Sequence, residues 1–278
     1  MLRLKPFDYY APRDLTSLFD LLTEETKVFA GGTDLFVKIK DGVLLPKVLV
    51  DLKRIDELQV LSYEEKKGLT IGAVNTLNEI AESPIVREKF PLLAECCSKV
   101  GSYQIRNKAT LVGNICNASP AADTAPALLI YDALVNIKGK DGERSVSILD
   151  FFTGPGSTVL KEGEIVTSVF VPYLDGCVGK YYKLSRIKSV DLATVGVAVA
   201  KLDGEYRIAL GAVAPTPLRI FEAEEILKEK RVTPALLDEV GKIIEKAVKP
   251  ITDLRGSAEY RREMSVVLTK RLLKELSE

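Results

Sequence analysis

The stretch Lys27-Val-Phe-Ala-Gly-Gly-Thr-Asp-Leu-Phe-Val-Lys-Ile-Lys40 decides the fold of the N-terminal part of the chain. Residues 27–30 form a short β-type run, Gly31-Gly32 ends it, and residues 35–40 have the pattern of a short helix that Gly42 stops. Glycines allow a sharp turn in which several backbone N–H groups converge on one anion, such as a pyrophosphate. A plain tight turn is the alternative interpretation. The spacing matches neither the Gly-x-Gly-x-x-Gly fingerprint nor a Walker loop, so we do not expect a Rossmann fold.

A second unusual segment follows at residues 101–123, which are polar and bear glycines. It contains Gln104-Ile-Arg-Asn-Lys-Ala-Thr-Leu-Val-Gly-Asn114 and Ser119-Pro-Ala-Ala-Asp123. A loop of this length usually carries a function. Its small, hydroxyl and amide side chains suit a cleft that holds a ribityl chain and phosphates, although a solvated loop with a capping Ser119 or Asp123 fits them equally well.

The rest of the chain alternates strand and helix signals, and Asp141-Gly142 and Asp203-Gly204 each predict a two-residue hairpin. The segment 171–176 reads as a strand end and a turn, which makes it the candidate domain boundary. After it, strands followed by helices indicate an α+β unit. The pattern predicts helices over 15–22, 76–80, 85–100, 127–134, 221–230, 234–248 and 259–276, and strands over 48–52, 68–73, 181–184, 193–201 and 206–213.

Composition excludes several classes of function. Lys plus Arg and Asp plus Glu both number 39 in 278 residues, so no net charge attracts nucleic acid or an anionic membrane. The absence of histidine removes histidine bases, imidazole-ligated metals and histidyl-linked flavin. The four cysteines have no cluster-binding or zinc-binding spacing, and we expect them to be buried in a reducing cell. No apolar run reaches the roughly 20 residues of a membrane span, and a cytoplasmic location is expected.

The ordered pair of the Ala30–Asp34 loop and the 104–123 segment resembles the FAD-binding medium subunits of molybdenum hydroxylases, of the xanthine dehydrogenase, carbon monoxide dehydrogenase and aldehyde oxidoreductase type. The likeness runs nearly end to end and includes residues 70–77, 183–193 and 253–262. It implies an α+β fold with a two-subdomain FAD-binding domain over residues 1–172, similar to the vanillyl-alcohol-oxidase type and broken near residue 55. A smaller α+β domain with antiparallel sheet and helices would span residues 173–278.

The resemblance also implies which residues hold a non-covalent FAD. The turn would bind the adenine and diphosphate side, with the amides of Gly31 to Asp34 as the anion nest. The 110–117 segment would hold the other side of the diphosphate and the ribityl chain, and Asp123 would accept bonds from hydroxyls. The full expected set is Lys27, Val28, Phe29, Ala30, Gly31, Gly32, Thr33, Asp34, Leu35, Gly101, Ile105, Ala109, Thr110, Gly113, Asn114, Cys116, Asn117, Ala122, Asp123, Val159, Leu160, Tyr181 and Lys183.

Two of these residues are expected to tune the flavin, since the resemblance places Lys183 near its polar edge and Tyr181 over one face. A cation there would raise the reduction potential, so Lys183→Met should lower it with little loss of fold. A side chain at Gly32 should meet the diphosphate. The family usually has Gly-Gly where this chain has Val112-Gly113, and Val112 would either displace the diphosphate or lie where φ is ordinary. We expect the second.

In the family, substrate is oxidised at a molybdopterin on a large subunit, and electrons pass through two [2Fe-2S] clusters of a small subunit to FAD and on to an external acceptor. Residues 186–191 border the flavin in the resemblance and are candidates for selecting that acceptor. We expect no catalytic residue and no metal site on this chain, and no inserted cysteine-rich segment for a [4Fe-4S] cluster. The alternatives are a free-standing FAD-dependent oxidase or dehydrogenase and a scaffold subunit that has lost FAD.

Overall fold

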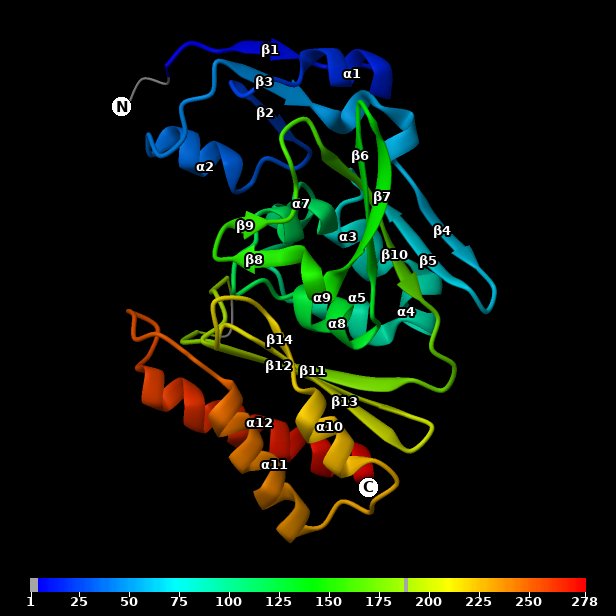
Figure 1. The fold of residues 1–278 in the computed structure, drawn as a ribbon, viewed down its shortest axis with the longest axis vertical. Helices are drawn as coiled ribbons and strands as arrows, with labels where there is room; N and C mark the ends of the chain where they lie inside the picture. Colours follow the sequence, from blue (N-terminus) through cyan, green and yellow to red (C-terminus); the bar gives the residue numbers. More distant parts are fainter. Residues whose placement is uncertain (1–4, 188–189) are drawn as a thin grey trace.

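A computed structural model describes residues 5–187 and 190–278, and it arranges them in three layers along the long axis of the molecule (Figure 1). The first layer is a small parallel sheet with the strand order β1-β3-β2. Its elements are β1 (Asp8–Tyr10), α1 (Leu15–Leu21), β2 (Thr26–Phe29), α2 (Leu35–Lys40) and β3 (Val48–Asp51). Two 3-10 turns, η1 (Leu52–Arg54) and η2 (Asp56–Leu58), then lead the chain into the second layer.

The second layer is an antiparallel sheet of order β4-β5-β10-β6-β7, with short helices packed beside it. A continuous hydrophobic core joins this layer to the first, from Leu18 and Val50 to Ile71 and Val169. The elements are β4 (Leu61–Glu64), β5 (Gly68–Gly72), α3 (Leu77–Glu82), α4 (Pro84–Lys89), α5 (Pro91–Ser98), α6 (Tyr103–Arg106), α7 (Leu111–Cys116), α8 (Ala125–Ile130), β6 (Leu134–Gly139), β7 (Gly142–Ser147), α9 (Ile148–Phe151), β8 (Phe152–Gly154), β9 (Ser157–Thr158) and β10 (Ile165–Pro172).

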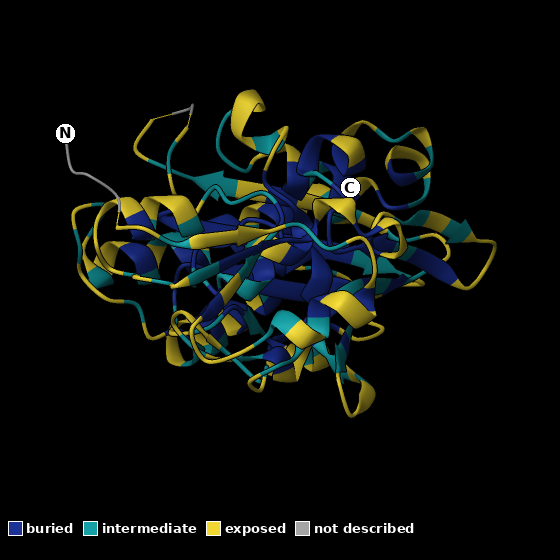
Figure 2. Ribbon diagram, turned by 90° about the horizontal axis from the view of Figure 1, so that it is seen from above, coloured by how far each residue is buried: buried dark blue, intermediate teal, exposed yellow. Residues whose placement is uncertain are grey.

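The third layer is the antiparallel sheet β11-β12-β13-β14, which three helices cover on the side away from the second layer (Figure 1). Val195, Val197 and Val199 face these helices, whereas Ala198 and Ala200 join the core of the second layer. Both faces of β12 are therefore buried, the larger side chains on one face and the smaller on the other. Across the molecule, buried segments lie toward the interior and exposed segments toward the periphery (Figure 2). The elements are β11 (Val178–Leu184), β12 (Val195–Leu202), β13 (Glu205–Gly211), β14 (Leu218–Arg219), α10 (Phe221–Leu227), α11 (Pro234–Ala247) and α12 (Ala258–Ser277).

The expected α+β fold with antiparallel sheet and helices in the C-terminal part is confirmed. The Asp203-Gly204 hairpin is confirmed as well, because both residues have positive φ (48° and 84°) between the paired Leu202 and Glu205. The other hairpin turns one residue earlier than expected. Its loop is Lys140-Asp141, and Gly142 already pairs with Gly139.

Three local predictions were wrong. The helix expected over 85–100 is two helices, α4 and α5, because Pro91 has no N–H to continue the first and disfavours a helical Phe90. The helix expected over 127–134 ends at Ile130, the chain reverses at Asp132 with φ 51°, and Leu134 starts β6. The segment 101–123 is not one loop, since it contains α6 and α7, which Ser102 and Thr110 cap.

Among the described residues, no helix combines the length and apolarity that a membrane crossing needs.

Arg261, on α12, anchors the third layer from inside. It is 1% exposed, and its Nη1 donates to the carbonyl oxygens of Thr194 (3.1 Å) and Ala212 (3.0 Å), while Nη2 donates to Asp253. Asp253 also accepts from the Arg255 guanidinium at 2.6 Å, and these hydrogen bonds hold the pKa of its carboxyl well below the usual range. The hydrogen bonds of Arg261 thus hold the start of α12 against the segment between β11 and β12.

We expect Arg261→Met to lower the free energy of unfolding by about 3 kcal/mol, because the two carbonyl oxygens lose a buried charged donor. Urea denaturation of the purified chain measures this loss. Arg262→Met is the matched control, since Arg262 is the next residue on α12 and is only partly buried, and it should change stability by no more than about 0.5 kcal/mol. Equal losses in the two variants would contradict the anchoring role.

Candidate cofactor site

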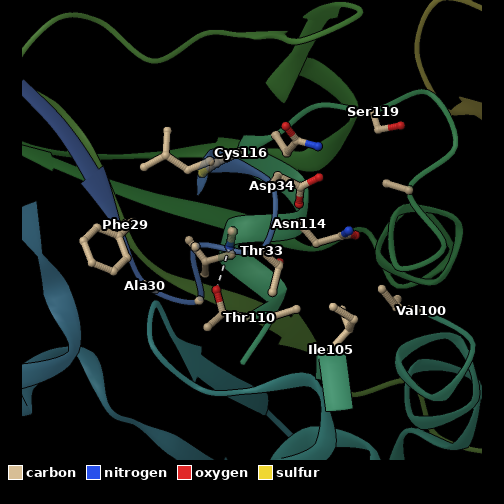
Figure 3. A pocket seen from close by; sticks show the side chains of 18 of the residues that line it. Phe29, Ala30, Thr33, Asp34, Val100, Ile105, Thr110, Asn114, Cys116 and Ser119 are labelled. Atoms are coloured by element: carbon tan, nitrogen blue, oxygen red, sulfur yellow. Dashed lines mark hydrogen bonds between the residues drawn. The ribbon is translucent and has the colours of Figure 1, made fainter. Parts of the chain in front are cut away.

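A cavity of about 640 Å³ lies where the first layer meets the second, within the range typical of cofactor sites. One wall is the β2–α2 turn, and the other is formed by α6, α7 and the segment that follows them (Figure 3). Beyond the expected residues, its lining includes Lys38, Leu52, Ala73, Val100, Val112, Ser119, Ala121, Glu164, Ile165, Val166, Val190, Asp191 and Leu192.

The β2–α2 turn offers free backbone donors to this cavity. In the described part of the chain, the N–H groups of Gly31, Gly32, Thr33 and Asp34 donate no hydrogen bond, although all four residues line the cavity. Gly31, Gly32 and Thr33 are partly buried and Asp34 is exposed, so a ligand in the cavity can reach this side of the turn. A row of N–H groups on a cavity wall fits an anionic ligand. Lys53 fixes the turn from outside, because its Nζ donates to Ala30 O (3.0 Å) and lies 4.3 Å from the centre of the Phe29 ring.

The two glycines of the turn are required by protein contacts. A Cβ on Gly31 would lie 2.1 Å from Lys108 O and 2.9 Å from Ala109 Cα, so only glycine allows the two walls to touch backbone to backbone. Gly32 has φ +72°, and a Cβ on it would lie 2.6 Å from the Phe36 ring. We expected a side chain at Gly32 to meet the diphosphate. The structure adds that such a side chain would also clash with the Phe36 ring of the protein.

The second wall is built around α7. Thr110 Oγ1 accepts from Gly113 N (2.9 Å), and Asn114 Oδ1 accepts from Thr124 Oγ1 (2.6 Å), which ties the helix to the segment before α8. Val112 lies inside α7 and lines the cavity with a nearly buried side chain. Its backbone is helical, so no glycine is needed there for a positive φ.

Two side chains of the third layer contact this wall at Asp123. Tyr181 Oη donates to Asp123 Oδ1 (2.8 Å), and Lys183 Nζ donates to Asp123 Oδ2 (2.7 Å) and to Lys99 O (2.9 Å). Asp123 is 5% exposed and lines the cavity. Burial raises the pKa of Asp123 above its ordinary value, and the Lys183 ammonium opposes this rise. Burial also raises the pKa of the Tyr181 phenol well above its ordinary range, which keeps the hydroxyl a donor.

The structure brings most of the expected cofactor residues to the cavity. The four that do not line it are Lys27, Val159, Tyr181 and Lys183. Lys27 is exposed on β2, and Val159 contributes its carbonyl oxygen to Arg144. The segment 186–191 falls partly outside the described residues, but Val190 and Asp191 do line the cavity. Among the residues that sequence reasoning missed, Lys38 had a usable signal, because it lies one helical turn after Asp34.

The described residues contain no group of three or more histidine, cysteine, aspartate or glutamate side chains that could hold a metal ion. Burial raises the pKa of the Cys116 thiol, which lies on the cavity wall, to about 12. This thiol is therefore protonated at neutral pH and is a poor nucleophile.

Comparisons with known proteins agree with this fold. Residues 5–174 match the family model of the FAD binding domain in molybdopterin dehydrogenase, and residues 180–276 match that of the CO dehydrogenase flavoprotein C-terminal domain. The chain is 34% identical to the glyceraldehyde dehydrogenase medium chain of Sulfolobus acidocaldarius, over 98% of each chain. It is 32% identical to the xanthine dehydrogenase FAD-binding subunit of Escherichia coli O157:H7, over 96% of this chain and 94% of that one. Among solved structures, a carbon monoxide dehydrogenase from Hydrogenophaga pseudoflava superposes with a TM-score of 0.92 at 33% identity, over 98% of this chain and 97% of that one.

We expect Gly31→Ala to lower the free energy of unfolding by about 1–3 kcal/mol, because the new methyl group forces apart two backbones that cannot rotate away. Chemical denaturation measures the loss. Gly154→Ala is the control, since a Cβ at Gly154 meets nothing within 4 Å, and it should be close to neutral. If Gly31→Ala is as stable as this control, the walls do not touch as described.

Lys183→Met should destabilise the chain by about 3–5 kcal/mol, because it leaves the Asp123 carboxylate buried without its cation. The buried ion pair thus replaces the expectation of little loss of fold with a prediction of a large one. The control is Lys180→Met on the same strand, where the ion pair with Glu275 is exposed and contributes less than about 1 kcal/mol.

This deficit should depend on pH. Without Lys183 the pKa of Asp123 rises further in the folded state, so the neutral acid is tolerated at low pH and the penalty grows as pH rises through that pKa. Denaturation midpoints of the variant and the wild type between acidic and neutral pH test this. A deficit that shrinks as pH rises would refute it.

Proposed function

The chain belongs to the FAD-binding medium subunits of the molybdenum hydroxylases, and from this premise we propose that it holds FAD between the [2Fe-2S] clusters of a partner subunit and an external electron acceptor. The single observation that carries the proposal is the cavity between the two walls, with four free backbone donors on one of them. When bound, FAD supplies chemistry that accepts and donates electrons one or two at a time.

The residues present fit this cofactor. The amides of Gly31 to Asp34 are suited to the diphosphate, since converging backbone donors bind phosphate oxygens without a formal positive charge. Thr110, Gly113, Asn114, Cys116 and Asn117 on and beside α7 are proposed to hold the other side of the diphosphate and the ribityl chain. Apolar lining residues such as Ile105 and Leu160 would keep water away from the ring.

Asp123 is proposed to accept hydrogen bonds from ribityl or ribose hydroxyls. Tyr181 and Lys183 each supply one donor to its carboxylate, and each carboxylate oxygen can accept more than one bond. We infer that these two residues act on the cofactor through Asp123, because neither lines the cavity itself. In this arrangement the Lys183–Asp123 pair presents almost no net charge to the flavin, so Lys183 has less influence on its potential than a free ammonium would.

The proposed partners are a large molybdopterin-binding subunit and a small [2Fe-2S] subunit, with the primary substrate oxidised on the large one. Support comes from the relatives, which are named medium chains and FAD-binding subunits of dehydrogenases. We further propose that residues 1–172, with a break near residue 55, form the FAD-binding unit and residues 173–278 a second unit. The separate hydrophobic core beneath α10, α11 and α12 supports that division.

The test is reduction of FAD in the reconstituted chain. With FAD bound, the chain should be reduced rapidly by a chemically reduced [2Fe-2S] partner and only negligibly by aldehydes or purines alone, as followed by flavin absorbance in rapid mixing. A chain that binds no FAD refutes the proposal. Rapid reduction by a small organic substrate without partners indicates a free-standing flavoenzyme and refutes it too.

A further inference from the structure

The charged side chains on the cavity wall differ in whether they form an ion pair. Among the described residues, five that carry a charge line the cavity: Asp34, Lys38, Asp123, Glu164 and Asp191. Three of the carboxylates have a cation outside the lining, because Asp123 pairs with Lys183, Glu164 with Arg144, and Asp191 with Arg186. Asp34 has no such partner within the described ranges. Lys38 is thus the one ammonium that the described residues bring to the wall.

Lys38 is available to an anion. Its Nζ donates to Asn117 Oδ1 at 2.6 Å, and none of the carboxylates in the described parts of the chain lies within salt-bridge distance of it. An ammonium has three donors, and the bond to the neutral Asn117 amide uses one of them. No described carboxylate therefore forms a direct ion pair with Lys38, although its side chain is partly buried.

The position of Lys38 directs it toward the free amides. It lies on α2, four residues after Asp34, and side chains on a helix lean toward the N-terminal end of that helix. The N-terminal end of α2 is the turn that carries the free N–H groups of residues 31–34. Asn117 is the C-cap of α7 on the opposite wall, so the Lys38–Asn117 bond spans the two walls.

We propose that Lys38 is the counter-ion of the FAD diphosphate and that Asn117 positions its ammonium. The inference rests on the proposed function, because it needs FAD to occupy this cavity. The backbone amides supply geometry without a full positive charge, and Lys38 supplies the charge that a dianionic diphosphate requires when it leaves water. The pair selects for the dinucleotide over a flavin that lacks phosphate.

The experiment compares the affinities of the full-length chain for FAD and for riboflavin, which has the same ring and ribityl chain without phosphate. Fluorescence titration gives both dissociation constants. Lys38→Met should weaken FAD binding by about 10- to 100-fold, the scale of one hydrogen bond to a charged group, and leave riboflavin binding within about twofold. The variant should also lose part of the salt dependence of FAD binding, because salt still weakens a charge pair that is only partly buried.

Three further variants separate charge from structure. Lys38→Gln keeps a donor for Asn117 without charge and should bind FAD as weakly as Lys38→Met, whereas Lys38→Arg should stay within a few-fold of wild type. Asn117→Ala should weaken FAD binding by a smaller factor than Lys38→Met. Lys40→Met is the matched control, since Lys40 is exposed on the same helix and does not line the cavity, and it should change nothing.

The outcomes are distinct. An equal loss of FAD and riboflavin binding in Lys38→Met, or its rescue by Lys38→Gln, would show that Lys38 only joins the walls, and either result overturns the inference. Unchanged FAD affinity in Lys38→Met overturns it as well and leaves the proposed function standing. Failure of the wild-type chain to bind FAD refutes the proposed function itself. Circular dichroism and thermal melting of each variant establish that a loss of binding is not a loss of fold.

Discussion

The contact on which the rest of the site depends is the backbone-to-backbone approach of Gly31 and the Lys108–Ala109 segment. It brings a small parallel sheet and an antiparallel layer together with no side chain between them. The cavity exists because the walls touch at this point and diverge beside it. Their relative position is set further by the shared hydrophobic core and by the bond between Lys38 and Asn117. At the contact itself the separation of the walls is fixed by backbone atoms and does not depend on side-chain rotamers.

The cavity combines two ways of binding an anion. The N–H groups of the β2–α2 turn point hydrogen bonds toward an anion in fixed directions. The Lys38 ammonium, which has no carboxylate partner among the described residues, supplies a positive charge. Three other carboxylates on the wall, those of Asp123, Glu164 and Asp191, pair with cations from outside the lining, so each can still accept hydrogen bonds while its charge is balanced. The wall therefore carries polar groups without a large net charge. This suits a long ligand whose middle part is anionic and whose other parts are uncharged.

Sequence patterns predicted the elements whose signals are local. The Gly-Gly turn, the helix after it and the Asp203-Gly204 hairpin follow from backbone preferences of a few residues, and they occur as expected. The errors arose where a neighbouring residue overrode the pattern, as Pro91 did in splitting one apolar helix into two. Most lining residues could be assigned through the family resemblance. Gly31 was expected only as part of a sharp turn; that it also contacts the backbone of Lys108 and Ala109, a distant segment of the same chain, is specified by no sequence pattern.

Other residues could not be predicted because long-range packing places them. The pairing of Lys183 and Tyr181 with Asp123 joins positions about 60 residues apart in sequence. Gly196, opposite on β12, makes it possible, because a Cβ there would lie 2.8 Å from the Tyr181 hydroxyl. Tyr181 and Lys183 of the third layer therefore balance the charge of Asp123 on the cavity wall, although neither side chain lines the cavity. Consequently, a chimaera that takes its C-terminal segment from another protein keeps the partners of Asp123 only if that segment supplies equivalents of Tyr181, Lys183 and Gly196.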